Sequence, residues 1–130
     1  MPGPNVILDK GFVVDAAAGI FTCQKLAAKE HVTIAGSAEA VVGILQQIVT
    51  TADAALGQVA DVRIHGISRA VASEAIAIGA RVRCAASGQV KNMAAATAKQ
   101  EQVGVALTAA AASGDHFDLL LTPSAQYTNA

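Results

Sequence analysis

Apolar and small residues alternate along a stretch in the last third of the chain. Val103, Val105 and Leu107 are separated by Gly104 and Ala106, a spacing of two residues. Successive side chains of a strand point to opposite faces of a sheet, so this spacing predicts a strand with the three branched side chains on one face. We expect that face to be buried.

The same stretch predicts a chain reversal and a second strand. The triplet Ser113-Gly114-Asp115 has the composition of a turn, because Gly accepts a positive φ and Asp bonds to its own backbone. Residues 117–121 are rich in β-forming types. Pro123 has no N–H to give to a strand ladder, so we expect the second strand to end there.

A similar order of features occurs upstream. The segment Val42-Gly43-Ile44-Leu45 is followed by an alanine-rich connection, by Gly57 and by an alternating run over residues 59–64. Residues 102–123 have the same order of strand with glycine, connection, glycine and strand. Because only two such units are present, we interpret them as a duplicated hairpin within a small β fold rather than as a solenoid.

Short apolar runs separated by small residues continue along the chain. We expect a hairpin from residues 12–15 and 20–26, a strand at His31–Ile34, and a hairpin from residues 81–84 and 89–93 in which Val82 and Cys84 share a face. The segment from Ile48 to Leu56 favours strand, loop and strand, with a short helix capped by residues 51–53 as the alternative. The spacing predicts an all-β fold, a small barrel or sandwich of short antiparallel strands with at most one or two short helices.

The domain organisation expected from the 130 residues is one β-rich domain at residues 11–130 behind a flexible arm at residues 1–10. Pro2-Gly3-Pro4 disfavours helix and strand, and no apolar side chain but Met1 precedes Val6. The apolar run Val6-Ile7-Leu8 suits strand addition to the edge of another protein's sheet, or an ordinary first strand of the chain itself.

Composition limits how far such a domain can stabilise itself. Hydrophobic residues make up 53% of the chain, but alanine dominates them, aromatic residues make up 3% and Trp is absent. Apolar burial contributes roughly 25 cal/mol per Å², and Ala buries little area. We therefore expect a thin core and self-association.

Charge and hydropathy exclude several partners. A net charge of −1 offers no basic surface for nucleic acid. No segment approaches the roughly twenty consecutive apolar residues that a membrane helix needs, and the first residues lack the pattern of a signal peptide. We expect a soluble protein, made in the cytoplasm, with neither nucleic acid nor a membrane as partner.

Residues that often carry chemistry are scattered. Cys23 and Cys84 lack the C-x-x-C spacing, so we expect reduced, semi-buried thiols, with a disulfide between them as the alternative. The histidines show no metal-ligand spacing, and the serines no G-x-S-x-G motif, which leaves only a triad assembled in space. We expect no catalytic, metal or cofactor site among these residues, which are His31, His65, His116, Ser68, Ser73, Ser87 and Ser113.

Three further patterns have structural interpretations. We expect Asp115 and Asp118 to be solvated, one in a turn and one on a strand, rather than a catalytic pair. Gly43 and Gly104 lie within strands, where Gly marks a bulge or a close approach of backbones rather than a phosphate loop. Lys91 resembles the hairpin lysine of lipoyl or biotinyl carriers, but Val90 precedes it where those carriers have Met or an acidic residue.

One combination of segments is typical of a family. These segments are Ile76-x-Ile-Gly79-Ala-x-Val82, Ser87-Gly88-x-Val90, Val103-Gly104-Val105-Ala106-Leu107, Ala109–Ala112, Gly114-Asp115 and Leu119–Leu121. Together they resemble the capsid cement, or head decoration, proteins of tailed bacteriophages. The resemblance covers residues 40–122 and is densest after Ile76. The chain differs from the family at Gly79-Ala80, where Gly-Asp is common, and its first third matches loosely.

The resemblance implies a structural protein without catalysis or cofactor. It implies binding to the outer surface of the phage head, where the protein clamps neighbouring major capsid proteins, commonly as a homotrimer. It implies a location in the virion after synthesis in the host cytoplasm. Together with the predicted arm, it makes Pro4, Asn5, Val6, Ile7 and Leu8 the expected capsid-binding residues. The alternatives are a small β-barrel ligand-binding or carrier module and a hydrolase with a triad assembled in space.

Overall fold

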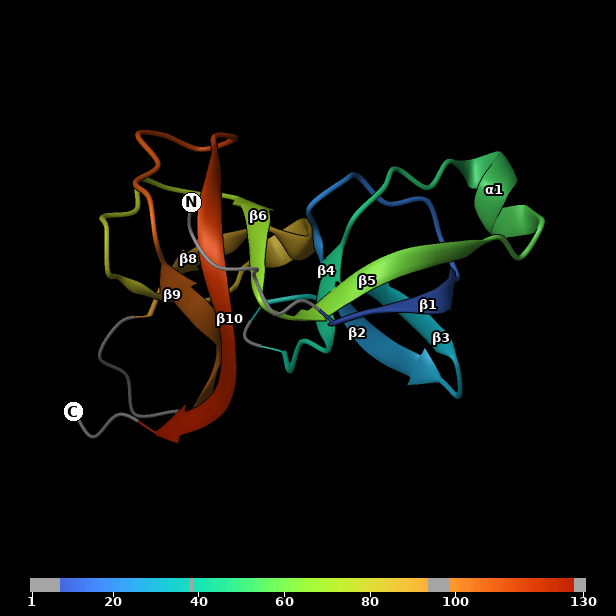
Figure 1. Cartoon of the computed structure of the whole chain (residues 1–130), viewed down its shortest axis with the longest axis horizontal. Helices are drawn as coiled ribbons and strands as arrows, with labels where there is room; N and C mark the ends of the chain where they lie inside the picture. The colour runs from blue at the N-terminus through green and yellow to red at the C-terminus, as the bar shows by residue number, and fades with distance from the viewer. Residues whose placement is uncertain (1–7, 38, 94–98, 128–130) are drawn as a thin grey trace, which may run out of the picture.

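A computed structural model describes residues 8–37, 39–93 and 99–127. These residues form ten strands, one short α-helix and one 3-10 turn (Figure 1). The strands are β1 (Leu8–Val14), β2 (Cys23–Ala28), β3 (His31–Ile34), β4 (Gly43–Leu45), β5 (Val59–His65), β6 (Ile67–Val71), β7 (Arg81–Cys84), β8 (Val90–Asn92), β9 (Lys99–Ala106) and β10 (His116–Tyr127). The helix α1 covers Thr51–Ala55 and the turn η1 covers Ala86–Gly88. The mainly-β fold expected from the sequence is confirmed.

The strands form two five-stranded units that follow each other along the chain. The first unit, β1 to β5, is a closed barrel in the order β1-β3-β2-β4-β5, with β5 paired back to β1. The second unit, β6 to β10, has the order β6-β10-β9-β7-β8. Gly66, with φ 105°, is the one residue between β5 and β6. Figure 1 shows the barrel and the second unit side by side along the long axis.

The two units share one topology. In each unit the first strand lies beside the last, the last beside the fourth, the fourth beside the second, and the second beside the third. In the barrel the third strand also pairs in parallel with the first, where Val14 faces Val32. In the second unit a single parallel bridge between Ala72 and Val90 takes this place. The second unit is therefore a less completely closed version of the barrel.

The pairing registers of the two units correspond as well. Phe12 faces Ala60 between β1 and β5, and Ala70 faces Phe117 between β6 and β10. Both units therefore have a pair of one Phe and one Ala at this position. The Phe lies on the first strand of the barrel but on the last strand of the second unit. Bridges outside the strands also match, Ala18–Val49 in the first unit and Ile76–Ala110 in the second. The predicted repeat is confirmed, and it extends from one hairpin to five strands.

Equivalent glycines show why the repeat is visible in the sequence. A Cβ atom on Gly43 of β4 would collide with the carbonyl oxygen of Arg63, and one on Gly104 of β9 with the carbonyl oxygen of Leu120. Arg63 on β5 and Leu120 on β10 hold equivalent positions, facing Ile44 and Val105 respectively. Both glycines mark close approaches of backbones, as expected.

The two units share part of their core. One cluster of buried side chains lies within the barrel and includes Phe12, Val14 and Val62. The other combines side chains of the second unit with Cys23, Ala35 and Ile44 of the barrel. Few of these side chains are large. Burial in the second unit therefore depends on contact with the first.

The predicted hairpin between residues 12–15 and 20–26 is wrong. β1 pairs with β5 and, in parallel, with β3, and not with β2. Ala18 and Val49 exchange two backbone hydrogen bonds of 2.8 and 2.9 Å, so the chain runs across the end of the barrel after β1 instead of turning back. The sequence predicted antiparallel strands only, and this expectation is wrong for β1 and β3, which pair in parallel.

The predicted hairpin of β9 and β10 is confirmed, but two details of it are wrong. Val103 is buried, whereas Val105 is partly exposed and Leu107 is 40% exposed. The pairing of β9 with both neighbours is irregular beside Val103, and such a bulge changes the alternation of side chains. β10 does not end at Pro123, which lies at the same irregularity, where a missing N–H is tolerated, and it continues to Tyr127.

Residues 48–56 contain the helix that the sequence offered only as the alternative, so the favoured strand-loop-strand interpretation is wrong. The Thr50 side chain accepts a hydrogen bond from the Asp53 N–H, and the Asp53 carboxylate accepts one from the Thr50 N–H. This reciprocal pair is a capping box, which stabilises the start of a helix. The predicted β7–β8 hairpin is confirmed, with Val82 and Cys84 both buried.

Candidate docking surfaces

The expected capsid-binding segment lies at the start of the described chain. Leu8 is the first residue of β1, faces His65 of β5 and is 49% exposed. Residues 8–10, which the predicted arm included, belong to β1. The other expected residues, Pro4, Asn5, Val6 and Ile7, lie outside the described residues. The arm at residues 1–10 and the single domain at residues 11–130 stay predictions.

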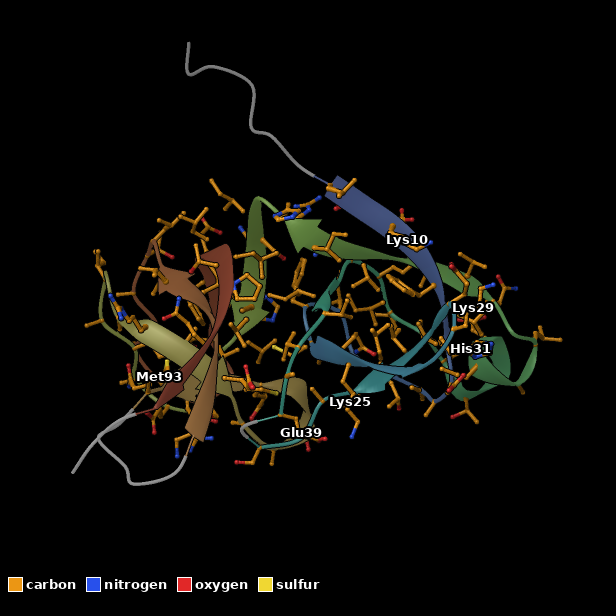
Figure 2. All side chains as sticks on the ribbon, turned by 90° about the horizontal axis from the view of Figure 1, so that it is seen from below. Lys10, Lys25, Lys29, His31, Glu39 and Met93 are labelled. Carbon is orange, nitrogen blue, oxygen red and sulfur yellow. The ribbon has the colours of Figure 1, made fainter. Side chains whose placement is uncertain are left out.

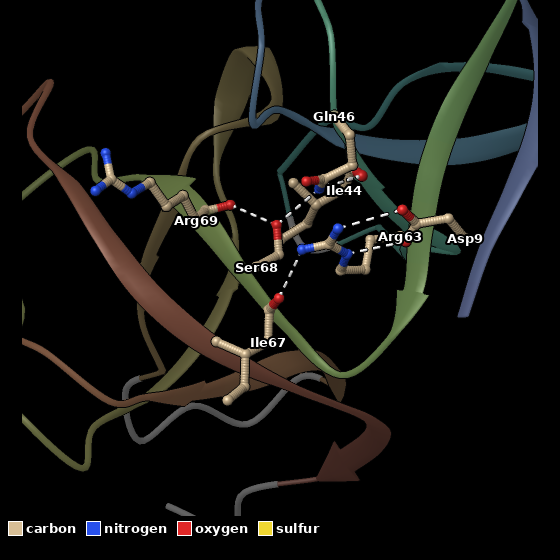
Figure 3. A network of polar contacts seen from close by, with 7 residues as sticks. All are labelled: Asp9, Ile44, Gln46, Arg63, Ile67, Ser68 and Arg69. Atoms are coloured by element: carbon tan, nitrogen blue, oxygen red, sulfur yellow. Dashed lines mark hydrogen bonds and ion pairs between the residues drawn. The ribbon is translucent and has the colours of Figure 1, made fainter. Parts of the chain in front are cut away.

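Arg63 fixes the start of β1 against the junction between the two units (Figure 3). Its guanidinium donates to both carboxylate oxygens of Asp9 on β1, over 2.9 and 3.2 Å. The same group donates to the carbonyl oxygen of Ile67 on β6, over 2.9 Å. Charge-assisted, two-pronged pairs of this kind have a well-defined geometry. One side chain of β5 therefore orients the first strands of both units.

A second polar connection crosses the junction beside Arg63 (Figure 3). The side-chain amide of Gln46, which follows β4, donates to the hydroxyl of Ser68 over 2.8 Å and to the carbonyl oxygen of Ile44 over 3.0 Å. The Ser68 hydroxyl in turn donates to the carbonyl oxygen of Arg69. Ser68 is buried, and its hydroxyl links β6 of the second unit to Gln46 of the barrel.

The barrel surface carries a hollow that sequence reasoning missed. It has a volume of about 430 Å³ and lies between β2 and the segment before β4. Leu26 at its edge is 61% exposed. In the sequence Leu26 is the last residue of a predicted strand, and no local pattern marks it as exposed. The lining residues are Lys25, Leu26, Glu39, Ala40, Val41 and Val42.

A charged pair holds one wall of this hollow. The Lys25 ammonium lies 2.6 Å from one carboxylate oxygen of Glu39, and the other oxygen accepts the N–H of Gly36 over 2.7 Å. Figure 2 shows Lys25 and Glu39 close together on this side of the barrel. The hydrogen bond from Lys25, followed by that from Gly36, lowers the pKa of Glu39. The pair ties the loop after β3 to β2.

The histidines lie in separate surroundings. His31 Nδ1 is 2.6 Å from an Asp15 carboxylate oxygen, and the His116 ring meets the Phe21 ring edge-on with centroids 5.4 Å apart. His65 faces Leu8. Within the described residues, no three His, Cys, Asp or Glu side chains gather as a metal site would require. Nor does any helix in that part of the chain have the length and apolar character to span a membrane.

Asp115, Asp118 and Lys91, which the sequence offered as possible functional residues, have structural roles instead. The Asp115 carboxylate accepts the N–H groups of Ala111 and Ala112, each over 3.1 Å, which is the expected role in a turn. Asp118 lies 3.9 Å from Arg69. Lys91 lies within β8 opposite Arg83, rather than in a turn. No contact of Lys91 favours a carrier function.

The two cysteines meet where the units join. Cys23 on β2 and Cys84 on β7 are free thiols and are fully buried, rather than semi-buried as expected. The Cys84 thiol donates to the carbonyl oxygens of Ala35 and Ala85 over 3.5 and 3.2 Å. A hydrogen bond with Cys84, together with burial, raises the pKa of Cys23. The thiolate is the reactive form of cysteine, so the raised pKa keeps Cys23 unreactive. Both side chains are part of the buried core.

Comparisons with known proteins agree with this architecture. A family model described as "Phage cement protein" matches residues 21–121. Among solved structures, the head fiber gp8.5 N base in bacteriophage phi29 is similar, with a TM-score of 0.67 and 11% sequence identity over 90% of this chain and 95% of that chain. At this identity the likeness shows the fold alone. No curated protein sequence matches the chain.

Proposed function

Because the chain belongs to the phage cement protein family, we propose that it binds the outer surface of a capsid and stabilises contacts between neighbouring major capsid proteins. The family consists of structural, non-enzymatic components of the phage head. Membership confirms both the resemblance found in the sequence and the expected structural role. The observation that carries the proposal is the family match over residues 21–121, which include β2 to β9 and the first half of β10.

The surface of the described residues supports a binding role. Large apolar side chains are exposed on both units, and burying any of them against a partner would remove apolar area from water. The most exposed are Leu26 (61%), Ile48 (62%), Leu56 (76%), Val59 (61%) and Ile78 (72%). At their equivalent positions, Ile48 and Val59 have Ala109 and His116. The common fold therefore does not require these exposed apolar groups.

We propose that Pro4, Asn5, Val6, Ile7 and Leu8 contact the capsid protein by adding a strand to it. Backbone hydrogen bonds then supply attachment, with little demand on side-chain identity. The exposed Leu8 at the start of β1 supports this assignment. Self-association, as a homotrimer in this proposal, would present several such segments at once, and linked contacts bind more tightly than single ones.

Removal of residues 1–7 tests the attachment. The truncation spares Leu8 and Asp9, so the Asp9–Arg63 pair that anchors β1 is retained. We expect the truncated protein to keep its circular dichroism spectrum and its oligomeric state, but to sediment with expanded heads at least about tenfold less tightly. A matched truncation of residues 128–130 should bind like the full chain. Full retention of the residue 1–7 truncation on heads would remove the proposed role of this segment.

A further inference from the structure

The two units contact each other through different faces. The barrel contributes Cys23 and Ala35, which meet Cys84 of β7 and Gly88 of the turn η1. Beside them, the Phe21 ring of the barrel meets the His116 ring of β10. The Gly88 N–H donates to the Ala35 carbonyl oxygen over 3.1 Å, and the Cys84 thiol donates to the same oxygen. The turn η1 lies between the units, drawn in dark yellow in Figure 1. The contact is therefore head to tail, not symmetric.

Because the two units are equivalent, each one also has the face that it does not use in this contact. On the barrel, we call Lys25, Leu26, Ala27 and Glu30 the hairpin face; they correspond to Arg83, Cys84, Ala85 and Gly88. Leu26 faces Val32 as Cys84 faces Val90, and Glu30 and Gly88 share a positive φ of 62° and 74°. The hairpin face is therefore the barrel's unused copy of the surface around η1.

On the second unit, we call Gly79, Arg81, Met93 and Val105 the open face; they correspond to Phe21, Cys23, Ala35 and Ile44. Arg81 faces Val105 as Cys23 faces Ile44. The Met93 N–H donates to the Arg81 carbonyl oxygen over 3.0 Å, as the Ala35 N–H does to that of Cys23. The open face is therefore the second unit's unused copy of the barrel surface that receives η1.

Exposure distinguishes the used faces from the unused ones. Cys84 is fully buried, whereas its counterpart Leu26 is 61% exposed. Cys23 is fully buried, whereas its counterpart Arg81 is exposed. In Figure 2, Met93 of the open face lies toward one end of the molecule, Lys25 of the hairpin face lies nearer the middle, and Lys29, in the turn that carries this face, lies toward the other end.

The unused faces carry opposite charges at one pair of matching positions. A Cβ atom on Gly88 would lie 3.2 Å from the backbone nitrogen of Cys23. The corresponding residues on the unused faces are Glu30 and Arg81, which carry opposite charges. In the same way, apolar Leu26 and Met93 replace Cys84 and Ala35. All four side chains are longer than their counterparts, so a repeat of the contact between two chains would have a wider spacing.

We propose that the hairpin face of one chain docks on the open face of a second copy, repeating between chains the contact that joins the two units within each chain. Glu30 then pairs with Arg81 of the next copy, and Leu26 packs against Met93. Contacts of this head-to-tail type close into a ring when the rotation permits, and three copies would place six similar units around one axis. The inference rests on the self-association in the proposed function and names its surface.

Charge reversal in the full chain tests this contact by sedimentation equilibrium. We expect the unaltered protein to associate, and Arg81→Glu or Glu30→Arg alone to weaken association by about tenfold or more, because like charges then face each other. The two substitutions together should restore the dissociation constant to within about threefold of the original. Glu30→Arg also removes the 2.7 Å ion pair with Lys10, so thermal unfolding followed by circular dichroism checks that each variant is folded.

Matched controls are Arg69→Glu and Asp61→Lys, which reverse charges on strands that neither face includes and should leave association unchanged. A monomeric unaltered protein, an oligomer that the single reversals leave intact, or a double variant as weak as the singles would each overturn the inference. Capsid attachment is measured separately, on heads. A chain that assembles as proposed but fails to bind heads refutes the proposed function and leaves the contact between copies standing.

Discussion

Where two strands approach most closely, a single residue decides whether the sheet tolerates a larger side chain. Gly104 leaves no room for a side chain against the carbonyl oxygen of Leu120. Because backbone atoms cannot give way as a flexible side chain does, we expect Gly104→Ala to lower the free energy of unfolding by about 1–3 kcal/mol. The midpoint of urea unfolding measures this change.

Gly19 provides the matched control for this substitution. A Cβ atom on Gly19 would lie 3.8 Å from the Thr22 side chain, an ordinary contact distance. We expect Gly19→Ala to change the free energy of unfolding by no more than about 0.5 kcal/mol. Equal effects at Gly19 and Gly104 would show that the close backbone approach is absent.

At the same scale, Glu39 makes the loop after β3 sensitive to acid. Lys25 and the Gly36 N–H lower its pKa from the ordinary value of 4.5. A carboxyl group whose pKa is lowered by folding stabilises the fold above its unfolded pKa, and that contribution is lost as the pH falls through the folded pKa. We expect the Gly36 amide resonance to titrate with a midpoint below 4.5, and Lys25→Met to raise that midpoint. A midpoint at or above 4.5 in the unaltered protein would contradict the geometry.

At the scale of elements, Arg63 couples three strands. It bonds Asp9 on β1 and the Ile67 carbonyl on β6 from its place on β5. Arg63 and Asp9 side chains are 21% and 30% exposed, so solvent weakens the pair only in part. We expect Arg63→Gln to lower the free energy of unfolding by about 1–2 kcal/mol.

Arg69 supplies the comparison for Arg63. Its guanidinium lies 3.9 Å from Asp118, and the two side chains are 62% and 47% exposed. Exposed pairs of this kind contribute little, so Arg69→Gln should change stability by no more than about 0.5 kcal/mol in the same urea experiment. If both substitutions have the same small effect, the Arg63 contacts do not couple the units.

Elements whose partners are close in sequence could be predicted from the chain. The hairpin of β7 and β8 and the pair of β9 and β10 follow from alternation and turn composition. The parallel pairing of β1 with β3 could not be predicted, because it depends on where residues 15–21 cross the barrel end to meet Val49. The burial of Val105 and Leu107 was mispredicted because a bulge does not show in a pattern of residue types.

The candidate surfaces were predictable only in part. The apolar run that includes Leu8 was recognised from composition, and the structure places Leu8 on an exposed strand end. The hairpin face and the open face were missed, since Leu26 and Arg81 resemble ordinary strand residues when they are considered alone. Their significance follows from comparing each with its counterpart in the other unit, which requires the strand registers.

Across the whole molecule, the second unit depends on the barrel for part of its core. Cys23, Ala35 and Ile44 of the barrel complete the core of the second unit. In an alanine-rich chain, the burial of any one side chain contributes little free energy of folding. Contact between the units therefore supplies apolar burial that large side chains would otherwise supply. The same physical reason favours further contacts, between copies and with a larger shell.

If the protein stabilises a phage head, it should raise the temperature at which heads release their DNA. Heads that lack the protein should be compared with the same heads after saturation with the purified chain, with a DNA-binding dye to detect release. We expect the decorated heads to release their DNA at a higher temperature. Release at the same temperature, with the protein shown to be bound, would contradict this expectation.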